Sequence, residues 1–137
     1  MTWETFPHEA DIGVRGFGVT LAEAFAGVAT AMIAAVCDPA QVMAREAVSI
    51  ECAAPDDELL LVDWLNALVY EMATRHMLFS RFEVNIAGHR LKAKAWGESI
   101  VAARHRPAAE VKGVTYCELA VRQQPDGSWL AQCVVDV

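Results

Sequence analysis

The sequence lacks the patterns that would place it among disulfide-bonded, zinc-binding or membrane-spanning proteins. It has four cysteines, but no C-x-x-C pair and no spacing with histidine that is typical of a zinc site. It also lacks a basic, apolar leader at its start, and no apolar run approaches the roughly 18 residues of a membrane span. We therefore expect a cytoplasmic protein with buried, free thiols. The four residues are Cys37, Cys52, Cys117 and Cys133.

Catalytic signatures and positive charge are also scarce. There is no G-x-S-x-G, P-loop or H-E-x-x-H motif, and the glycine-rich run 13–18 does not have the G-x-G-x-x-G order. Lysine and arginine number 11 against 18 acidic residues, which gives a net charge of −7. Such a charge argues against coating nucleic acid, although it leaves room for a local basic patch or a basic partner. Nothing in the sequence indicates a self-contained enzyme.

What is present indicates one α+β domain covering residues 1–137. Thr20 and Glu23 form a capping box, which predicts a helix that continues until Asp38-Pro39. A second, largely apolar helix is predicted over about 57–75, buried against more than one neighbour. Alternation and turn residues predict strands over 11–18, 47–52, 82–86, 91–95, 113–122 and 129–137. The order β-α-β-α-β-β-β-β predicts a mixed or antiparallel sheet of about six strands covered by two helices.

The last predicted strand carries two anionic groups next to each other, the side chain of Asp136 and the terminal carboxylate of Val137. Asp11 opens the first predicted strand. If these strands are neighbours, the three carboxylates would form a site for a hard cation such as calcium or magnesium rather than zinc. The alternative is an edge strand whose Asp136 is simply exposed to solvent.

Two further groups of residues are candidates for function. Asp63 interrupts a leucine-rich helix, with Asn66 on the same side, so it is either solvated or deliberately paired. The segment 104–112 holds three cations and a histidine; it is either a solvated loop or a surface for phosphate or an acidic partner. His8 is either structural or a neighbour of the Asp11 site.

Four segments in register resemble the archease family. They are 8–13 (HEADIG), 60–68 (LLVDWLNAL), 110–116 (EVKGVTY) and the final Asp-Val. Family members are small activators of the RtcB-type tRNA-splicing RNA ligase, and promote its guanylylation by GTP and its turnover. By position, the resemblance implies a calcium site at Asp11, Asp136 and Val137. It also implies roles in partner activation for Asp63, Lys112 and His105. Cys117 departs from the family, many members of which have histidine there.

The leading hypothesis is therefore a non-catalytic accessory protein. Its partner would be an RtcB-type RNA ligase, through which it would meet RNA and GTP, with no contact with a membrane. One alternative is a small metal-dependent phosphoesterase that uses the carboxylates and the basic segment. Another is a general chaperone or a modulator of RNA-modifying enzymes, against which the absence of a long exposed apolar run counts.

Overall fold

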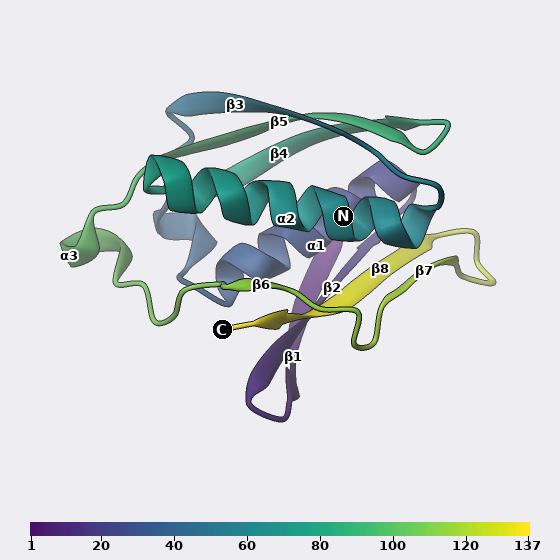
Figure 1. Ribbon diagram of the computed structural model, residues 1–137, viewed down its shortest axis with the longest axis horizontal. Coiled ribbons are helices and arrows are strands. Elements are labelled where there is room, and N and C mark those ends of the chain that lie inside the picture. Colours follow the sequence, from purple (N-terminus) through teal and green to yellow (C-terminus); the bar gives the residue numbers. More distant parts are fainter.

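A computed structural model describes all 137 residues, and it has two antiparallel sheets with the two long helices between them (Figure 1). One sheet has five strands in the order β1-β2-β8-β6, with β7 also paired to β8; the other has the order β3-β5-β4. The elements are β1 (Thr2–His8), β2 (Asp11–Gly18), α1 (Leu21–Ala34), the 3-10 helix η1 (Pro39–Gln41), β3 (Glu46–Ala53), α2 (Asp57–Arg75), β4 (Met77–Ala87), β5 (Arg90–Ser99), the short helix α3 (Ala102–His105), β6 (Gly113–Val114), β7 (Ala120–Gln123) and β8 (Trp129–Asp136).

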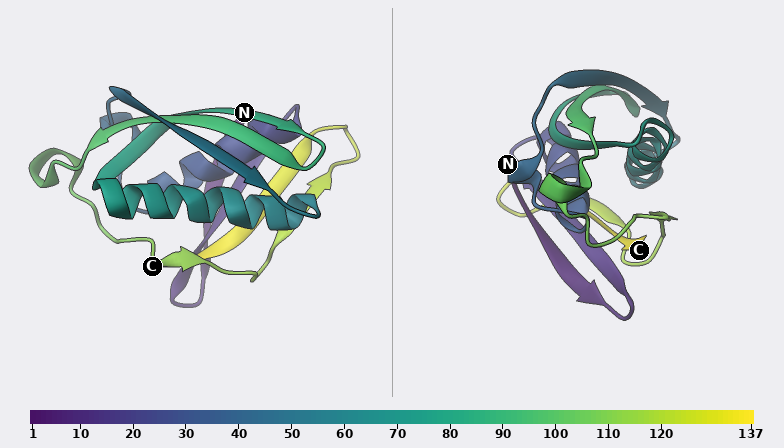
Figure 2. Two further views of the ribbon diagram at one scale, coloured as in Figure 1. Left: turned by 45° about the horizontal axis from the view of Figure 1, so that its top comes forward. Right: turned by 90° about the vertical axis from the view of Figure 1, so that its left-hand side faces the viewer.

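The prediction of an α+β fold with two main helices is confirmed, but the single sheet of about six strands is wrong. The eight strands form two sheets, all of whose pairings are antiparallel. Strand β1 was missed because it is an edge strand that is exposed along most of its length, so its sequence has no apolar alternation. With β2 it forms a hairpin that projects from the body of the molecule (Figures 1 and 2).

The predicted strand 113–122 is also wrong, because the chain leaves the sheet between β6 and β7. Both short strands pair with β8, and residues 115–119 loop between them. Hydrogen bonds fix the loop to β8: the Oγ1 and the N–H of Thr115 donate to the carbonyl of Val134 at 2.8 and 2.9 Å, and the Val134 N–H donates to Cys117 O at 3.1 Å. Cys117 is consequently exposed, which corrects the expectation that all four free thiols are buried.

Helix α1 begins as the sequence predicts and ends earlier. The Thr20 hydroxyl accepts from the Glu23 N–H at 3.1 Å, which completes the capping box. The helix ends at Ala34, and Asp38 instead caps η1 by accepting from the Ala40 N–H at 3.0 Å. A Cβ atom on Gly16 of β2 would lie 2.2 Å from the backbone nitrogen of Val28. Glycine at this position therefore lets α1 lie directly on β2.

Helix α2 has the predicted bounds and packs against strands of both sheets. Asp56 caps it by accepting from the Leu59 N–H at 2.8 Å, and His76 ends it in the left-handed conformation (φ 53°). Trp64 is fully buried, and its Nε1 donates to the Phe25 carbonyl of α1 at 3.0 Å. The core lies between the helices and the two sheets: α1 contacts β2, β8 and β4, and α2 contacts β3, β4 and β6. No helix combines the length and the apolar character needed to span a membrane.

Candidate functional site: carboxylates at adjacent strand ends

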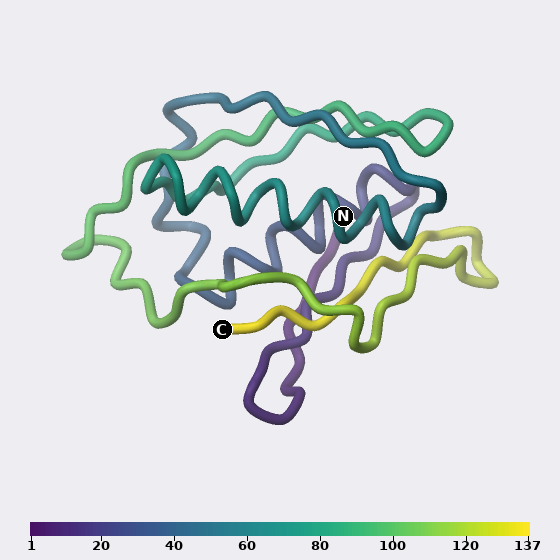
Figure 3. The backbone as a smooth tube through the Cα atoms, viewed as in Figure 1, coloured from purple at the N-terminus to yellow at the C-terminus, as the bar shows by residue number.

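The register of the five-stranded sheet brings the two predicted carboxylates together. Strand β8 lies between β2 and β6, and Ile12 pairs with Val135. Continuing this antiparallel register by one residue places Asp11, the first residue of β2, opposite Asp136, the last residue of β8. On the other side of β8, Gly113 pairs with Asp136, and the Lys112 N–H donates to the Asp136 carbonyl at 2.8 Å. We call Asp11, Lys112, Asp136 and Val137 the strand-end cluster; the backbone trace shows the chain end beside β6 (Figure 3).

The charges of this cluster are not balanced within the molecule. Asp136 and Lys112 are exposed and Asp11 is half-buried. None of the three side chains takes part in an ion pair or a side-chain hydrogen bond. Like charges directly opposite on neighbouring strands disfavour the folded state. A cation held between the two carboxylates would remove that repulsion.

The oxygen ligands of the strand-end cluster suit a hard cation, but they are few. Nowhere in the structure do three or more His, Cys, Asp or Glu side chains gather as a metal site would require. The cluster offers two carboxylate side chains, with Val137 directly after Asp136. There is open space beside Gly113, where an added Cβ would meet no atom within 4 Å. All-oxygen donors with room for further ligands suit calcium better than zinc. The metal itself stays a prediction.

Asp63 lies outside the strand-end cluster. It is exposed on the face of α2 that also carries Asn66 and Tyr70, and it forms no hydrogen bond or ion pair with any residue of the cluster. Its charge is felt at Cys52 of β3: burial raises the pKa of the Cys52 thiol, and the Asp63 carboxylate raises it further. Asp63 is therefore solvated, and its role in partner activation stays a prediction.

His105 is placed where it cannot touch a partner directly. The residue is 3% exposed. Its Nδ1 accepts from the Val101 N–H at 2.8 Å, so the proton of the neutral ring is on Nε2, which lies 3.0 Å from Oε2 of Glu98. Any contribution of His105 to activation must act through the segment that it holds in place.

Glu98 connects this segment to the rest of the fold, and the sequence analysis did not identify it. It is only 5% exposed, and its carboxylate accepts from the Met43 N–H at 2.7 Å and lies 2.7 Å from Arg104 and 3.2 Å from Arg45. With His105, these partners join the start of β3, the end of β5 and the helix α3. No local pattern indicates this, because Met43 is 55 residues away in the chain.

We expect the Glu98 network to make stability depend on pH in the acidic range. The hydrogen bond from Met43, with those from His105 and Arg104, lowers the pKa of Glu98 from 4.5 to about 2. A lowered carboxyl pKa stabilises the fold above 4.5, and this contribution is lost as the pH falls from 4.5 towards 2. Glu98→Gln should therefore lower the unfolding temperature at pH 7, with a smaller difference at pH 2.5.

Thermal unfolding followed by circular dichroism between pH 2 and pH 7 checks this. Glu83→Gln is a suitable control because Glu83 is exposed on the outer face of β4. Parallel pH profiles for the wild type and Glu98→Gln would contradict the assignment.

The fold and the strand-end cluster define a small α+β protein with two antiparallel sheets around two helices and paired carboxylates at one sheet end. The model of the Archease protein family (MTH1598/TM1083) matches residues 3–137. Protein archease of Pyrococcus abyssi is 39% identical over an alignment of 139 residues that covers 98% of each chain. Protein archease of Sulfolobus acidocaldarius is 34% identical over an alignment of 137 residues, which also covers 98% of each chain. The chain belongs to the archease family, as the four sequence segments predict.

Solved structures agree with this assignment. The solution structure of protein 1598 from Methanobacterium thermoautotrophicum is similar with a TM-score of 0.85 at 33% identity, covering 98% of both chains. The crystal structure of an archease from Thermotoga maritima, described as a possible chaperone, has a TM-score of 0.60 at 17% identity over 96% of this chain and 94% of that one. The second likeness concerns the fold alone.

Proposed function

We propose that this protein is a non-catalytic activator of an RtcB-type RNA ligase, promoting the ligase's guanylylation by GTP and its multiple turnover. Membership of the archease family over nearly the whole chain supports this function. The observation that carries it is the register of β2, β8 and β6, which gathers Asp11, Asp136 and Lys112 at one exposed end of the sheet.

In this proposal Asp11, Asp136 and Val137 would hold a calcium ion. Calcium would supply positive charge and open coordination positions for an oxygen ligand of the partner. The protein's own contribution is rigidity. Backbone ladders on both sides of β8 fix the two aspartates relative to each other, so little conformational entropy is lost when the site forms.

The contacts with the ligase would come from exposed charges near this end. Lys112 enters β6 directly beside Asp136, and its exposed ammonium is free to bind an acidic or phosphate group of the partner. Asp63 would contact the ligase from the exposed face of α2. His105 would act indirectly, by anchoring the segment that leads to Lys112 through its bond to Glu98.

The direct test is to mix a cognate RtcB-type ligase with GTP, with and without this protein, and to measure guanylylated ligase. The proposal predicts faster guanylylation with the protein, and a loss of that effect with excess chelator of calcium. This protein with metal and phosphate esters, but without ligase, should show no turnover. Turnover by the protein alone would favour the phosphoesterase hypothesis instead.

Single substitutions at the proposed contacts should weaken activation without unfolding the protein. Asp63→Ala and Lys112→Ala should each raise the concentration of protein needed for half-maximal stimulation by about fivefold, the effect of losing one solvent-exposed ion pair. Lys94→Ala is a matched control, because Lys94 is exposed on the outer face of β5 and forms no ion pair. Equal stimulation by Lys112→Ala and Lys94→Ala would exclude a specific role for Lys112.

A further inference from the structure

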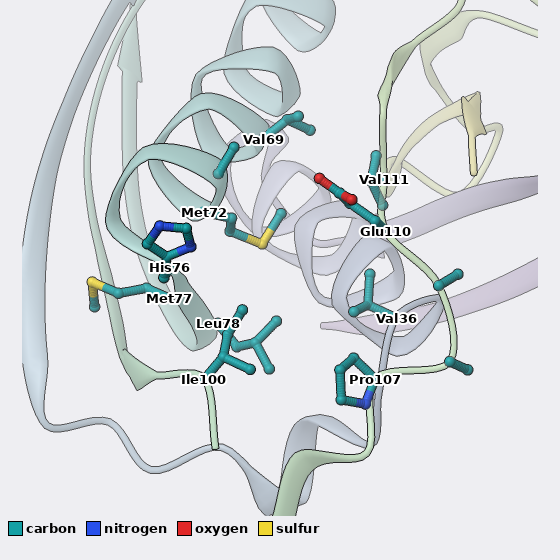
Figure 4. Close-up of a pocket in the computed structure, with 13 residues that line it drawn as sticks. Val36, Val69, Met72, His76, Met77, Leu78, Ile100, Pro107, Glu110 and Val111 are labelled. Carbon is teal, nitrogen blue, oxygen red and sulfur yellow. The ribbon is translucent and has the colours of Figure 1, made fainter. Parts of the chain in front are cut away.

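A cavity of about 510 Å³ lies between the C-terminal half of α2, the end of α1 and the segment 100–111 (Figure 4). Ten of its thirteen lining residues are hydrophobic. The volume is within the range of about 300–1,000 Å³ that is typical of binding pockets. The proposed function makes no use of this cavity.

The walls of the cavity are fixed by the backbone. The Ala108 N–H donates to the Val36 carbonyl at 2.8 Å, which ties the segment to the end of α1. The Ile100 N–H donates to the His76 carbonyl at 2.9 Å, which ties it to the end of α2. Between these points the segment is anchored by the buried pair of His105 and Glu98. The cavity therefore exists before anything binds, and little ordering is needed on binding.

The polar groups at this apolar cavity favour a cation. Figure 4 shows the carboxylate of Glu110 directed across the cavity towards Val69 and Met72. Glu110 forms no ion pair within the molecule, so its carboxylate is available to a ligand. The helix α2 also ends at this wall, so its negative end faces the cavity.

We propose that this cavity binds an arginine side chain on the surface of a partner protein. The methylene stem would lie on Met72, Val69 and Ile100, and the guanidinium would pair with Glu110. Arginine suits the site better than lysine because its guanidinium is weakly hydrated, packs on apolar surface and binds a carboxylate with two parallel hydrogen bonds. The net charge of −7 favours a partner with a basic surface.

The test uses n-butylguanidinium as the probe and n-butylurea as its neutral isostere. Each is titrated into the ¹⁵N-labelled protein, and amide shifts are followed by NMR. We expect butylguanidinium to shift amides of Met72, Ala73, His76, Ile100 and Glu110, with weaker shifts for butylurea. Equal affinity for both compounds would show an apolar ligand site and overturn the proposal. Absence of shifts at the cavity with butylguanidinium would overturn it as well.

Variants of the protein test whether the Glu110 carboxylate and the cavity bind the probe. Glu110→Gln should weaken butylguanidinium binding by about threefold to fivefold, as expected for a partly exposed ion pair, and leave butylurea binding unchanged. Ala73→Trp should fill the cavity and remove the shifts. Glu58→Gln is the matched control, since it removes one acidic charge near the start of the same helix, about 20 Å from Met72. An unchanged affinity in Glu110→Gln would contradict the role of its carboxylate.

The same variants separate this inference from the proposed function. If the partner is the ligase, Ala73→Trp should raise the concentration needed for half-maximal stimulation and preserve the maximal rate. A ligase that the wild-type protein does not stimulate would refute the proposed function, while the butylguanidinium titration would still decide the nature of the cavity.

Discussion

Replacing Asp11 and Asp136 together by asparagine should abolish stimulation of the ligase and leave the fold intact. Asparagine keeps the shape of each side chain and removes the charge that a hard cation requires. Isothermal titration calorimetry should show the calcium dissociation constant rising more than about tenfold, or binding disappearing. Without calcium, the unfolding temperature should not fall, because the substitution removes like charges from opposite positions on β2 and β8.

The control is Asp38→Asn, which removes one acidic charge elsewhere. Asparagine can still cap η1 through its side-chain oxygen, so the turn should be preserved. Calcium binding and stimulation should remain those of the wild type. Full stimulation by the double variant would refute the role of the two carboxylates, whatever its calcium affinity.

Trp64→Ala should lower the free energy of unfolding by about 3–5 kcal/mol, the usual cost of truncating a buried tryptophan. The side chain is fully buried against Phe82, with ring centroids 6.0 Å apart, and its Nε1–H bond joins α2 to the carbonyl of Phe25 in α1. Its loss leaves a cavity and removes the hydrogen bond that joins the two helices. Urea denaturation followed by circular dichroism measures the change.

The neighbouring Asp63 gives the contrasting result. Asp63→Ala removes an exposed carboxylate and should change stability by no more than about 0.5 kcal/mol, while it weakens activation. A large loss of stability in Asp63→Ala, or a small one in Trp64→Ala, would contradict the packing of α2 described above.

The features that could be read from the sequence are those set by local chemistry. The capping box at Thr20 and the apolar length of α2 located the two helices, because capping and helical apolar character depend on residues close in the chain. Strand β1 and the break between β6 and β7 could not be predicted from the sequence. An exposed edge strand has no apolar alternation, and the loop at 115–119 is fixed to β8 by bonds such as that from Thr115 to Val134, which lies 19 residues further along the chain.

Some residues of the candidate site could likewise be predicted from the sequence, and others could not. Asp11 and Asp136 could be predicted as candidates because each is at the end of a predicted strand, and the pairing of β2 with β8 places them opposite each other. Glu98 was missed because its partners, Met43 and His105, come from separate loops. The resemblance implies a role in partner activation for His105, and only the structure shows that its ring is buried.

The most direct test of the central claim is the rate at which labelled GTP guanylylates a cognate RtcB-type ligase with wild-type protein or with Asp136→Asn. Both proteins are added at equal concentration and with equal free calcium. We predict that the wild type accelerates guanylylation over ligase alone and that Asp136→Asn does not. No acceleration by the wild type, or the same acceleration by both proteins, would contradict the account.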